Sequence, residues 1–319
     1  MFPTPHTPHP IPHTPHPTPH TPHPTPHTPH PIKNMNPIQW YPGHIAKAEK
    51  QLKEQLKRVD VVLEVRDARI PLATHHPQLS GWVGEKSRVL ILNRIDSILP
   101  EVRQGWEEWF AKRGETAHFT NGQQGTGIDE VAKAARSTGE AVNRRRKERG
   151  MLPRPVRAVV IGFPNVGKSA IINRLLKRRV VKSARFPGVT RQLRWVRMSD
   201  ELELLDSPGI LPWRLDNRDD GVKLAICDDI GEAAYDNQRV AHAFIELVVD
   251  LDAIAPECIP IKLWRSRYKI DPKSMTGESY LHELSQRRHK GDVERTARQI
   301  LSDYRRGFLG PLPLELPPM

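Results

Sequence analysis

The chain has 319 residues, with 49 Lys and Arg against 37 Asp and Glu, so its formal net charge is +12. This length supports two modest domains with a sizeable core. Two cysteines exclude a disulfide framework and a four-cysteine zinc module. No apolar run approaches the roughly 18 residues that a membrane span needs. The basic balance favours a polyanionic partner.

Residues 1–34 are a low-complexity segment that holds 13 of the 31 prolines and 8 of the 15 histidines. The phrase His-Thr-Pro-His recurs every 7 residues. Such a segment buries too little apolar surface to offset its ordering entropy, so we predict an extended, solvated tail rather than a metal-binding histidine tract. We further hypothesise that translation starts at Met35 and that the repeat is a gene-start artefact. N-terminal sequencing of the native protein tests this.

The rest of the chain predicts strands that alternate with helices. The predicted elements are a helix over 44–58, strands over 61–65 and 89–92, helices near 101–113 and over 128–149, a strand over 158–161, a helix to about 178, and strands over 193–199 and 201–206. This order predicts an α/β domain over 35–215, with a mostly parallel sheet and helices on both faces. A small all-helical domain over 216–310 and a proline-rich tail over 311–319 follow.

A phosphate-binding loop is predicted over 162–169, where Gly-Phe-Pro-Asn-Val-Gly-Lys-Ser fits G-x-x-x-x-G-K-[ST] between a strand and a helix. The glycines allow backbone N–H groups to surround a β-phosphate. Lys168 would reach the β- and γ-phosphates as a catalytic group, and Ser169 would bind Mg2+. The nucleotide contacts expected from this loop are Asn165, Val166, Gly167, Lys168, Ser169 and Ala170.

A second motif, Asp-Ser-Pro-Gly over 206–209, is expected to contact the metal ion and the γ-phosphate. Asp206 would hold Mg2+ directly or through water, and the N–H of Gly209 would meet the γ-phosphate. Thr190, in a turn-rich stretch between the two motifs, is the candidate for a second Mg2+ hydroxyl and for a catalytic role.

A base-reading motif, Asn-Arg-Ile-Asp, covers residues 93–96. It fits N-K-x-D, in which the aspartate accepts from two guanine N–H groups that adenine does not offer together. Asn93, Arg94 and Asp96 are therefore expected nucleotide contacts. Arg94 replaces the usual lysine, and its aliphatic stem can still cover the base. Asn121 and Gly122 are candidates for the backbone contact to the guanine oxygen.

The base-reading motif precedes the phosphate loop, whereas in ordinary Ras-like GTPases it follows, so the order looks circularly permuted. With Trp-Tyr-Pro-Gly-His over 40–44 and Asp-Ala-Arg-Ile-Pro over 67–71, these motifs resemble the ribosome biogenesis GTPase A family. The resemblance spans about residues 38–215. It implies a cytoplasmic permuted P-loop GTPase, monomeric, that acts in late assembly of the large ribosomal subunit, with a C-terminal helical RNA-binding domain.

The resemblance also assigns catalytic roles. Ile210 stands where Ras-like enzymes carry a glutamine that orients water, and it cannot do so. The resemblance points instead to His44, which would position water or accept a proton; the alternative is that His44 only caps a helix. Asn165 matches the asparagine with which potassium-activated relatives bind K+. It also fits the turn without any cation.

Basic residues gather in three places. Residues 174–194 hold eight Lys and Arg without an acid, and residues 144–157 hold seven against Glu148. Residues 264–319 hold eleven against seven acids, with Trp264, Tyr268, Tyr280 and Tyr304 among them. The first run brackets the turn-rich stretch of Thr190, where the chain would respond to the γ-phosphate, and it favours binding of RNA. We predict a GTPase, slow alone and stimulated by the ribosome. The alternatives are an RNA-binding scaffold with little turnover, and a small-subunit GTPase, whose zinc module the two cysteines cannot supply.

Overall fold

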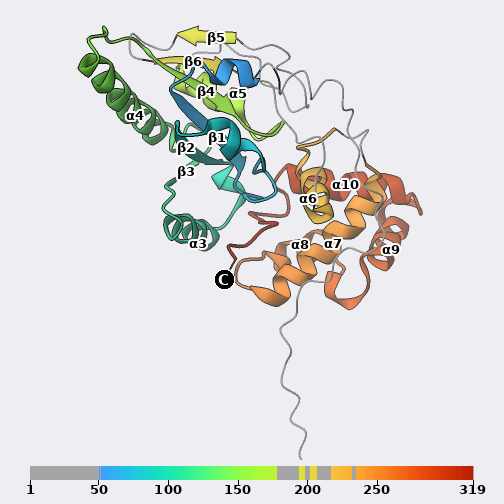
Figure 1. Cartoon of the computed structure of the whole chain (residues 1–319). Coiled ribbons are helices and arrows are strands. Elements are labelled where there is room, and N and C mark those ends of the chain that lie inside the picture. The colour runs from blue at the N-terminus through green and yellow to red at the C-terminus, as the bar shows by residue number, and fades with distance from the viewer. Residues whose placement is uncertain are drawn as a thin grey trace, which may run out of the picture. The chain divides into compact units, whose positions relative to one another are not determined.

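The computed structural model describes residues 50, 52–177, 194–197, 202–206, 217–231 and 235–318 (Figure 1). Within these residues a six-stranded sheet has the order β3-β2-β1-β4-β6-β5. All neighbouring strands are parallel except β5 and β6. The strands are β1 (Val61–Asp67), β2 (Ser87–Asn93), β3 (Ala117–Thr120), β4 (Val156–Ile161), β5 (Arg194–Arg197) and β6 (Leu202–Asp206).

The strand that carries the phosphate loop lies inside the sheet, although three strands precede it in the chain. β4 pairs with β1 through Val61 and Ala158, and with β6 through Val160 and Asp206. The base-reading motif therefore ends the strand two places away from β4. The predicted mostly parallel sheet, with its permuted order of motifs, is confirmed.

Alternating residues of the central strands face two differently covered sides of the sheet. Val61, Leu63 and Val65 of β1 share a core with α4 (Ile128–Glu148) and α5 (Lys168–Leu175). Val62 points the other way, into a core with Leu52 and Leu56 of a helical turn and with α2 (Leu79–Val83). Burial on both faces is what a run of valines in a parallel sheet predicts.

Most predicted elements appear within a few residues of their expected bounds. Of the helix expected over 44–58, residues 52–56 are helical, whereas 44–49 and 51 lie outside the described residues. α3 (Pro100–Ala111) covers β2 and β3 through Trp106 and Phe110. Two elements are missing from the prediction: β3, which has only four residues, and α2, which has only five. Elements this short leave too little periodicity to recognise.

The C-terminal region is helical, as predicted, through α6 (Arg218–Cys227), α7 (Asn237–Ile254), α8 (Ile261–Tyr268), α9 (Gly277–His289) and α10 (Val293–Arg305). Side chains of Asn217, Asp236, Thr276 and Asp292 accept from backbone N–H groups at four helix starts. Such caps stabilise each helix by about 1 kcal/mol. Among the described residues, no helix is both long and apolar enough to cross a membrane.

Four of the aromatic residues of this region form its core and do not offer stacking surfaces for RNA, whereas Phe308 is exposed. The rings of Trp264, Tyr268, Tyr280 and Tyr304 are each at most 4% exposed. Trp264 stacks edge-on against Phe244 and donates to the hydroxyl of Tyr280 at 2.8 Å. The guanidinium groups of Arg267 and Arg306 instead lie over the ring of Phe308, at 4.8 and 4.7 Å from its centroid.

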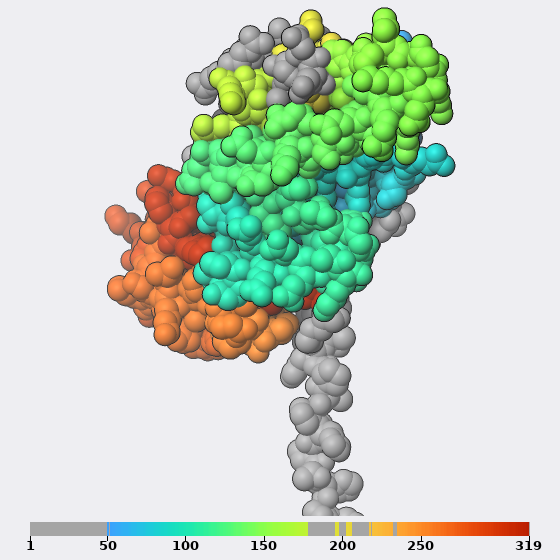
Figure 2. Space-filling model, turned by 90° about the vertical axis from the view of Figure 1, so that its left-hand side faces the viewer, coloured from blue at the N-terminus to red at the C-terminus, as the bar shows by residue number. Residues whose placement is uncertain are grey.

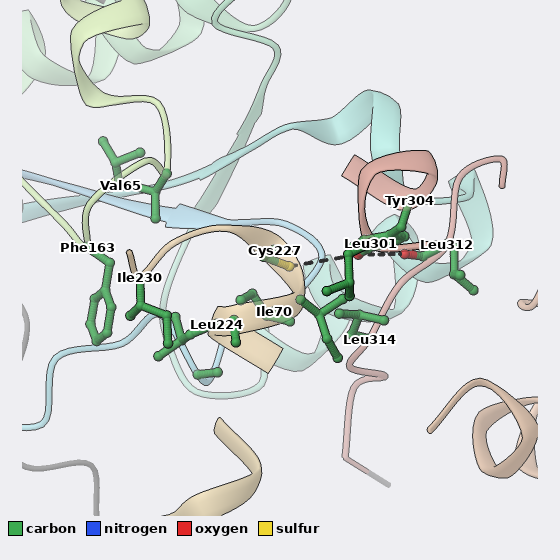
Figure 3. Close-up of a cluster of buried hydrophobic side chains, with 14 of the residues drawn as sticks. Val65, Ile70, Phe163, Leu224, Cys227, Ile230, Leu301, Tyr304, Leu312 and Leu314 are labelled. Carbon is green, nitrogen blue, oxygen red and sulfur yellow. Dashed lines mark hydrogen bonds between the residues drawn. The ribbon is translucent and has the colours of Figure 1, made fainter. Parts of the chain in front are cut away.

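The same core continues from the sheet into the helices. Figure 3 shows Phe163 of the phosphate loop with Leu224 and Ile230, and Cys227 with Tyr304. The hydroxyl of Tyr304 donates to the carbonyl of Leu312 at 3.2 Å.

The proline-rich segment after α10 is packed. Leu312 and Leu314 are buried, and the backbone N–H groups of Leu314 and Glu315 donate to the carbonyl of Arg69 at 3.0 and 3.1 Å. The Glu315 carboxylate accepts from the N–H groups of Leu72 and Ala73, and from the ammonium of Lys223 at 3.0 Å. One side chain thus ties the loop after β1, α6 and the end of the chain together.

Replacing Glu315 with glutamine should lower the free energy of unfolding by about 2 kcal/mol, because Lys223 loses its partner and one acceptor becomes a donor. Thermal unfolding of the full chain measures this. Glu257→Gln is the control, because this exposed side chain accepts only from the Cys258 thiol and forms no salt bridge within the described residues. Equal unfolding temperatures for the two variants would contradict the role given to Glu315.

Candidate nucleotide-binding site

The loop between β4 and α5 is packed so tightly that only glycine fits at two positions. A Cβ at Gly162 would lie 2.2 Å from the carbonyl oxygen of Val65. Gly167 has φ of +100°, and a Cβ there would lie 2.1 Å from the side-chain nitrogen of Asn93. The glycines of the motif therefore allow the loop to approach β1 and the base-reading motif closely.

Lys168 is the first residue of α5, and its side chain is buried beneath the loop. Its ammonium donates to the carbonyls of Gly162 at 3.2 Å and Phe163 at 2.7 Å. Ser169 follows, half-buried, in the first turn. The N-terminus of α5 presents N–H groups without intrahelical partners, together with its positive dipole end, which favours an anion at this point.

Asn93 joins the phosphate loop to the turn after β3. Its amide nitrogen donates to the carbonyl of Val166 at 2.8 Å. Its oxygen accepts from the N–H of Gly122 at 2.9 Å and from the hydroxyl of Thr120 at 3.2 Å. The side chain predicted to contact the nucleotide is therefore also a positioning residue, which fixes two loops relative to each other.

The guanidinium of Arg94 contacts two partners, which a lysine ammonium could not do in the same way. It lies in the left-handed region with φ of 70°. One terminal nitrogen donates to the carbonyl of Asn165 at 2.7 Å, and Nε lies 3.2 Å from the Asp67 carboxylate. A lysine has a single side-chain nitrogen, whereas the guanidinium of an arginine can contact the carbonyl and the carboxylate with separate nitrogens. The departure from N-K-x-D thus ties the phosphate loop to a buried carboxylate of β1.

Asp96 lies exposed in the 3-10 helix η1 (Ile95–Ser97). Among the described residues, none forms a hydrogen bond or ion pair with its carboxylate, so both oxygens can accept from a base. Asn121 instead serves its own turn: its side-chain oxygen accepts from the N–H groups of Gln123 and Gln124, each at 2.9 Å. Gly122 lies against Ala170, because an added Cβ would lie 3.2 Å from the Cβ of that residue.

Asn165 connects the phosphate loop to the helical region. It lies in the left-handed region with φ of 58°, and its side-chain nitrogen donates to the carbonyl of Asp228 at 2.6 Å. Next to it, Asp229 is fully buried, and neither carboxylate oxygen has a hydrogen-bond partner within the described residues. Burial and the nearby Asp67 raise the pKa of Asp229 well above its usual range. No motif in the sequence marks these two aspartates.

Several predicted site residues lie outside the described residues, namely His44, Thr190, Gly209 and also Ile210. Asp206 is described only by its backbone. As the last residue of β6 it pairs with Val160 of β4, so it ends its strand beside the strand that leads into the phosphate loop. The half-buried Ser169 and the position of Asp206 fit an Mg2+ site, which prefers oxygen ligands. Asn165 carries an amide oxygen, a ligand type that suits K+, and its amide nitrogen donates to the carbonyl of Asp228.

The structure thus brings the phosphate loop, the base-reading motif and the turn over 121–126 to one edge of the sheet, at the carboxyl ends of β4, β2 and β3. This is where parallel α/β sheets bind their ligands. Asn93, Arg94, Gly122, Asn165 and Val166 meet there through the hydrogen bonds above, and Gly167 packs against Asn93. The edge provides a cradle for phosphate, an acceptor for a base, and a connection to α6.

Comparison with known proteins agrees with this arrangement. A family model described as "50S ribosome-binding GTPase" matches residues 157–276. Ribosome biogenesis GTPase A of Bacillus licheniformis is 33% identical over 286 residues, covering 88% of this chain and 98% of the relative. Mitochondrial ribosome-associated GTPase 1 of Mus musculus is 29% identical over 303 residues, covering 87% and 90%.

Solved structures share the fold. A GDP-bound YlqF structure matches with a TM-score of 0.58 and 23% identity, covering 84% of this chain and 99% of the other. The structure of YlqF from T. maritima with bound GNP matches with a TM-score of 0.56 and covers 85% and 98%. With its motifs, sheet order and near-complete coverage of the Bacillus relative, the chain belongs to the ribosome biogenesis GTPase A family, a family of GTPases.

Proposed function

We propose that the chain is a GTP-hydrolysing assembly factor for the large ribosomal subunit, which binds pre-ribosomal RNA in the GTP state and leaves after hydrolysis. The observation that carries this proposal is that the phosphate loop contacts the base-reading motif and the end of α6 at one sheet edge. Within the described part of the chain, no residue pairs with Asp96 of that motif. The names of the relatives, ribosome biogenesis GTPase A and mitochondrial ribosome-associated GTPase 1, support the ribosomal partner. Turnover is slow without the ribosome, because Ile210 cannot orient water.

In this proposal the residues have separate tasks. The loop N–H groups and Lys168 bind the phosphates of GTP or GDP, and Asp96 selects guanine. Ser169, Thr190 and Asp206 would hold Mg2+, and Asn165 would hold K+; these cations would neutralise phosphate charge. His44 would position the attacking water, and the N–H of Gly209 would meet the γ-phosphate. Support comes from the motif spacing and from the sheet edge that Asp206 shares with the loop.

The wider setting is also proposed. The division into a tail over 1–34, a GTPase domain over 35–215, a helical RNA-binding domain over 216–310 and a terminal segment over 311–319 follows the composition and the element order. A cytoplasmic monomer suits the bacterial relatives. The hydrogen bond between Asn165 and Asp228 would couple nucleotide binding to the helical region. A cation or phosphate that binds the Asn165 amide would compete with, or reorient, this hydrogen bond.

The variant Asp96→Asn should bind GTP at least a hundredfold more weakly and should gain affinity for xanthosine triphosphate. Guanine offers two adjacent donors, which a carboxylate accepts, whereas an amide has one donor and one acceptor and so matches xanthine. Titration with fluorescent analogues of the two nucleotides measures this. Asp129→Asn, an exposed carboxylate in the first turn of α4, is the control. Unchanged preference for GTP in Asp96→Asn would remove Asp96 from the site.

Sedimentation with purified large ribosomal subunits tests the partner. The full chain should sediment with subunits in the presence of a non-hydrolysable GTP analogue and remain in the supernatant with GDP. Small subunits provide the control. Equal sedimentation with both nucleotides would contradict a GTP-controlled assembly factor and favour an RNA-binding scaffold.

A further inference from the structure

A strongly basic surface lies at the C-terminal end of α4, away from the nucleotide-binding site. Arg144, Arg145, Lys147 and Arg149 carry no salt bridge to any described residue, and three of them are at the last turn of the helix or just beyond. The only acid among them is Glu148. Positive charge at a helix C-terminus complements its dipole, but that effect is worth less than about 1 kcal/mol per charge and does not require so many.

A groove of about 520 Å³ runs beside this end of α4, between the helix and the segment that leads into β4. Its floor is fixed: the side chain of Asn143 exchanges two hydrogen bonds with the backbone of Arg154, and Arg154 pairs with Asp60 at 2.8 and 2.9 Å. Gly139 brings the helix close, since a Cβ there would lie 2.1 Å from Val156. Figure 2 shows the face of the molecule on which α4 lies.

Three cations of the groove lie on one face of the helix, and a fourth, Arg154, lies in the segment that leads into β4. Arg136, Arg144 and Lys147 line the groove at helical spacing, over a rise of about 16 Å at 1.5 Å per residue. Glu140 is the single acid among the lining residues, and it forms no salt bridge with them within the described part of the chain. These two arginines and one lysine form no salt bridge with a described residue, and they stand on a rigid support. Such a row suits a row of phosphates, because each guanidinium can donate two parallel hydrogen bonds to one phosphate and the lysine adds a point charge.

We propose that this groove, with the arginines at the end of α4, binds the phosphate backbone of structured RNA. Proteins contact double-helical RNA through phosphates and shape rather than base edges, which fits a groove with cations and without exposed aromatic side chains. An anionic membrane is a poorer match, because the exposed apolar side chains beside the groove are Met151 and Leu152, too few for an interfacial anchor. The inference rests on charge and geometry at α4 and does not depend on the proposed function.

The test uses the full chain and a fluorescently labelled 20-base-pair RNA duplex, with anisotropy measured between 50 and 200 mM KCl. Arg144→Glu/Lys147→Glu should bind at least tenfold more weakly and reduce the slope of log affinity against log salt by about two. The single variant Lys147→Glu is compared with Lys112→Glu, which makes the same change of net charge elsewhere. Lys112 is an exposed residue after α3 that forms no salt bridge with the described residues. Arg144→Lys keeps the charge but loses the two parallel hydrogen bonds, so it should lose less affinity than Arg144→Glu.

Three results would contradict the proposed RNA site. Equal losses in Lys147→Glu and Lys112→Glu would show an effect of net charge only, and unchanged binding in the double variant would exclude the groove. Vesicles with 30% phosphatidylserine form the second arm; binding to them that is lost in the double variant, without a change in RNA binding, would assign the surface to membranes. Affinity for GTP, measured on the same samples, should stay unchanged, which separates this result from any failure of the nucleotide site.

Discussion

Gly167→Ala is expected to lower the affinity for GTP at least a hundredfold. The added methyl group would lie 2.1 Å from the amide nitrogen of Asn93, at a backbone φ of +100° that an alanine rarely adopts. Either the phosphate loop or Asn93 has to move, and Asn93 also holds the carbonyl of Val166 and the N–H of Gly122. Both the phosphate cradle and the turn near the base are therefore disturbed. Titration with a fluorescent GTP analogue measures the loss.

A matched glycine provides the control for this variant. Gly81 lies in α2, and an added Cβ would meet nothing within 4 Å. Gly81→Ala should therefore bind GTP as the natural chain does, and its unfolding temperature should be slightly higher because alanine favours the helix. Binding of GTP by Gly167→Ala within threefold of the natural chain would show that the close approach of the loop to Asn93 is not required.

Glu64→Gln is expected to lower the free energy of unfolding by about 3 kcal/mol. Glu64 is a buried residue of the central strand β1, and its carboxylate lies 2.6 Å from Arg66, 2.6 Å from Arg88 and 3.0 Å from His75. Glutamine would leave the buried Arg66 without a counter-charge, and an unpaired charge in a low-dielectric interior is costly. Chemical unfolding of the full chain at pH 7 measures the difference.

The same cluster determines how the fold responds to acid. Burial alone would raise the pKa of Glu64, but the hydrogen bond with His75 and the charge of Arg66 outweigh it and hold that pKa well below its ordinary value of 4.5. The ionised carboxylate therefore stabilises the fold above about pH 4.5, and this contribution is lost as the pH falls toward the folded-state pKa. Glu64→Gln should lose less stability between pH 5 and 3 than the natural chain does.

Glu115→Gln is the control for both measurements. Its carboxylate also pairs with Arg88 but is one-third exposed, so its loss should cost less than about 1 kcal/mol. If Glu64→Gln is no less stable than Glu115→Gln, the buried cluster does not stabilise β1.

The sheet and the phosphate site could be predicted because they depend on local patterns. Runs such as Val61–Val65 predict a strand that is buried on both faces of a sheet. A glycine-rich loop of this pattern between a strand and a helix typically binds phosphate. The placement of Asn93, Lys168 and Ser169 at one sheet edge follows from the fact that the carboxyl ends of parallel strands meet there. These inferences need no knowledge of distant contacts.

Other features depend on contacts between residues far apart in the chain. Nothing near Asp228 indicates that its carbonyl meets Asn165, 63 positions earlier. Glu315 stands in a proline-rich stretch that looks like a tail, yet it accepts hydrogen bonds from the loop at 72–73. In the sequence Arg94 is a conservative exchange for lysine, whereas in the structure its guanidinium contacts both Asn165 and Asp67. Pattern alone cannot supply such pairings, because they arise only when the elements pack.

The central claim is that this chain hydrolyses GTP in response to the large ribosomal subunit. The most direct measurement is GTP turnover by the full chain in K+ buffer, with and without purified large subunits, with ATP as the control nucleotide. We expect slow GTP turnover alone, a strong rise with large subunits, and no turnover of ATP. GTP turnover that large subunits do not change would contradict the claim, and equal turnover of ATP would contradict the guanine site at Asp96.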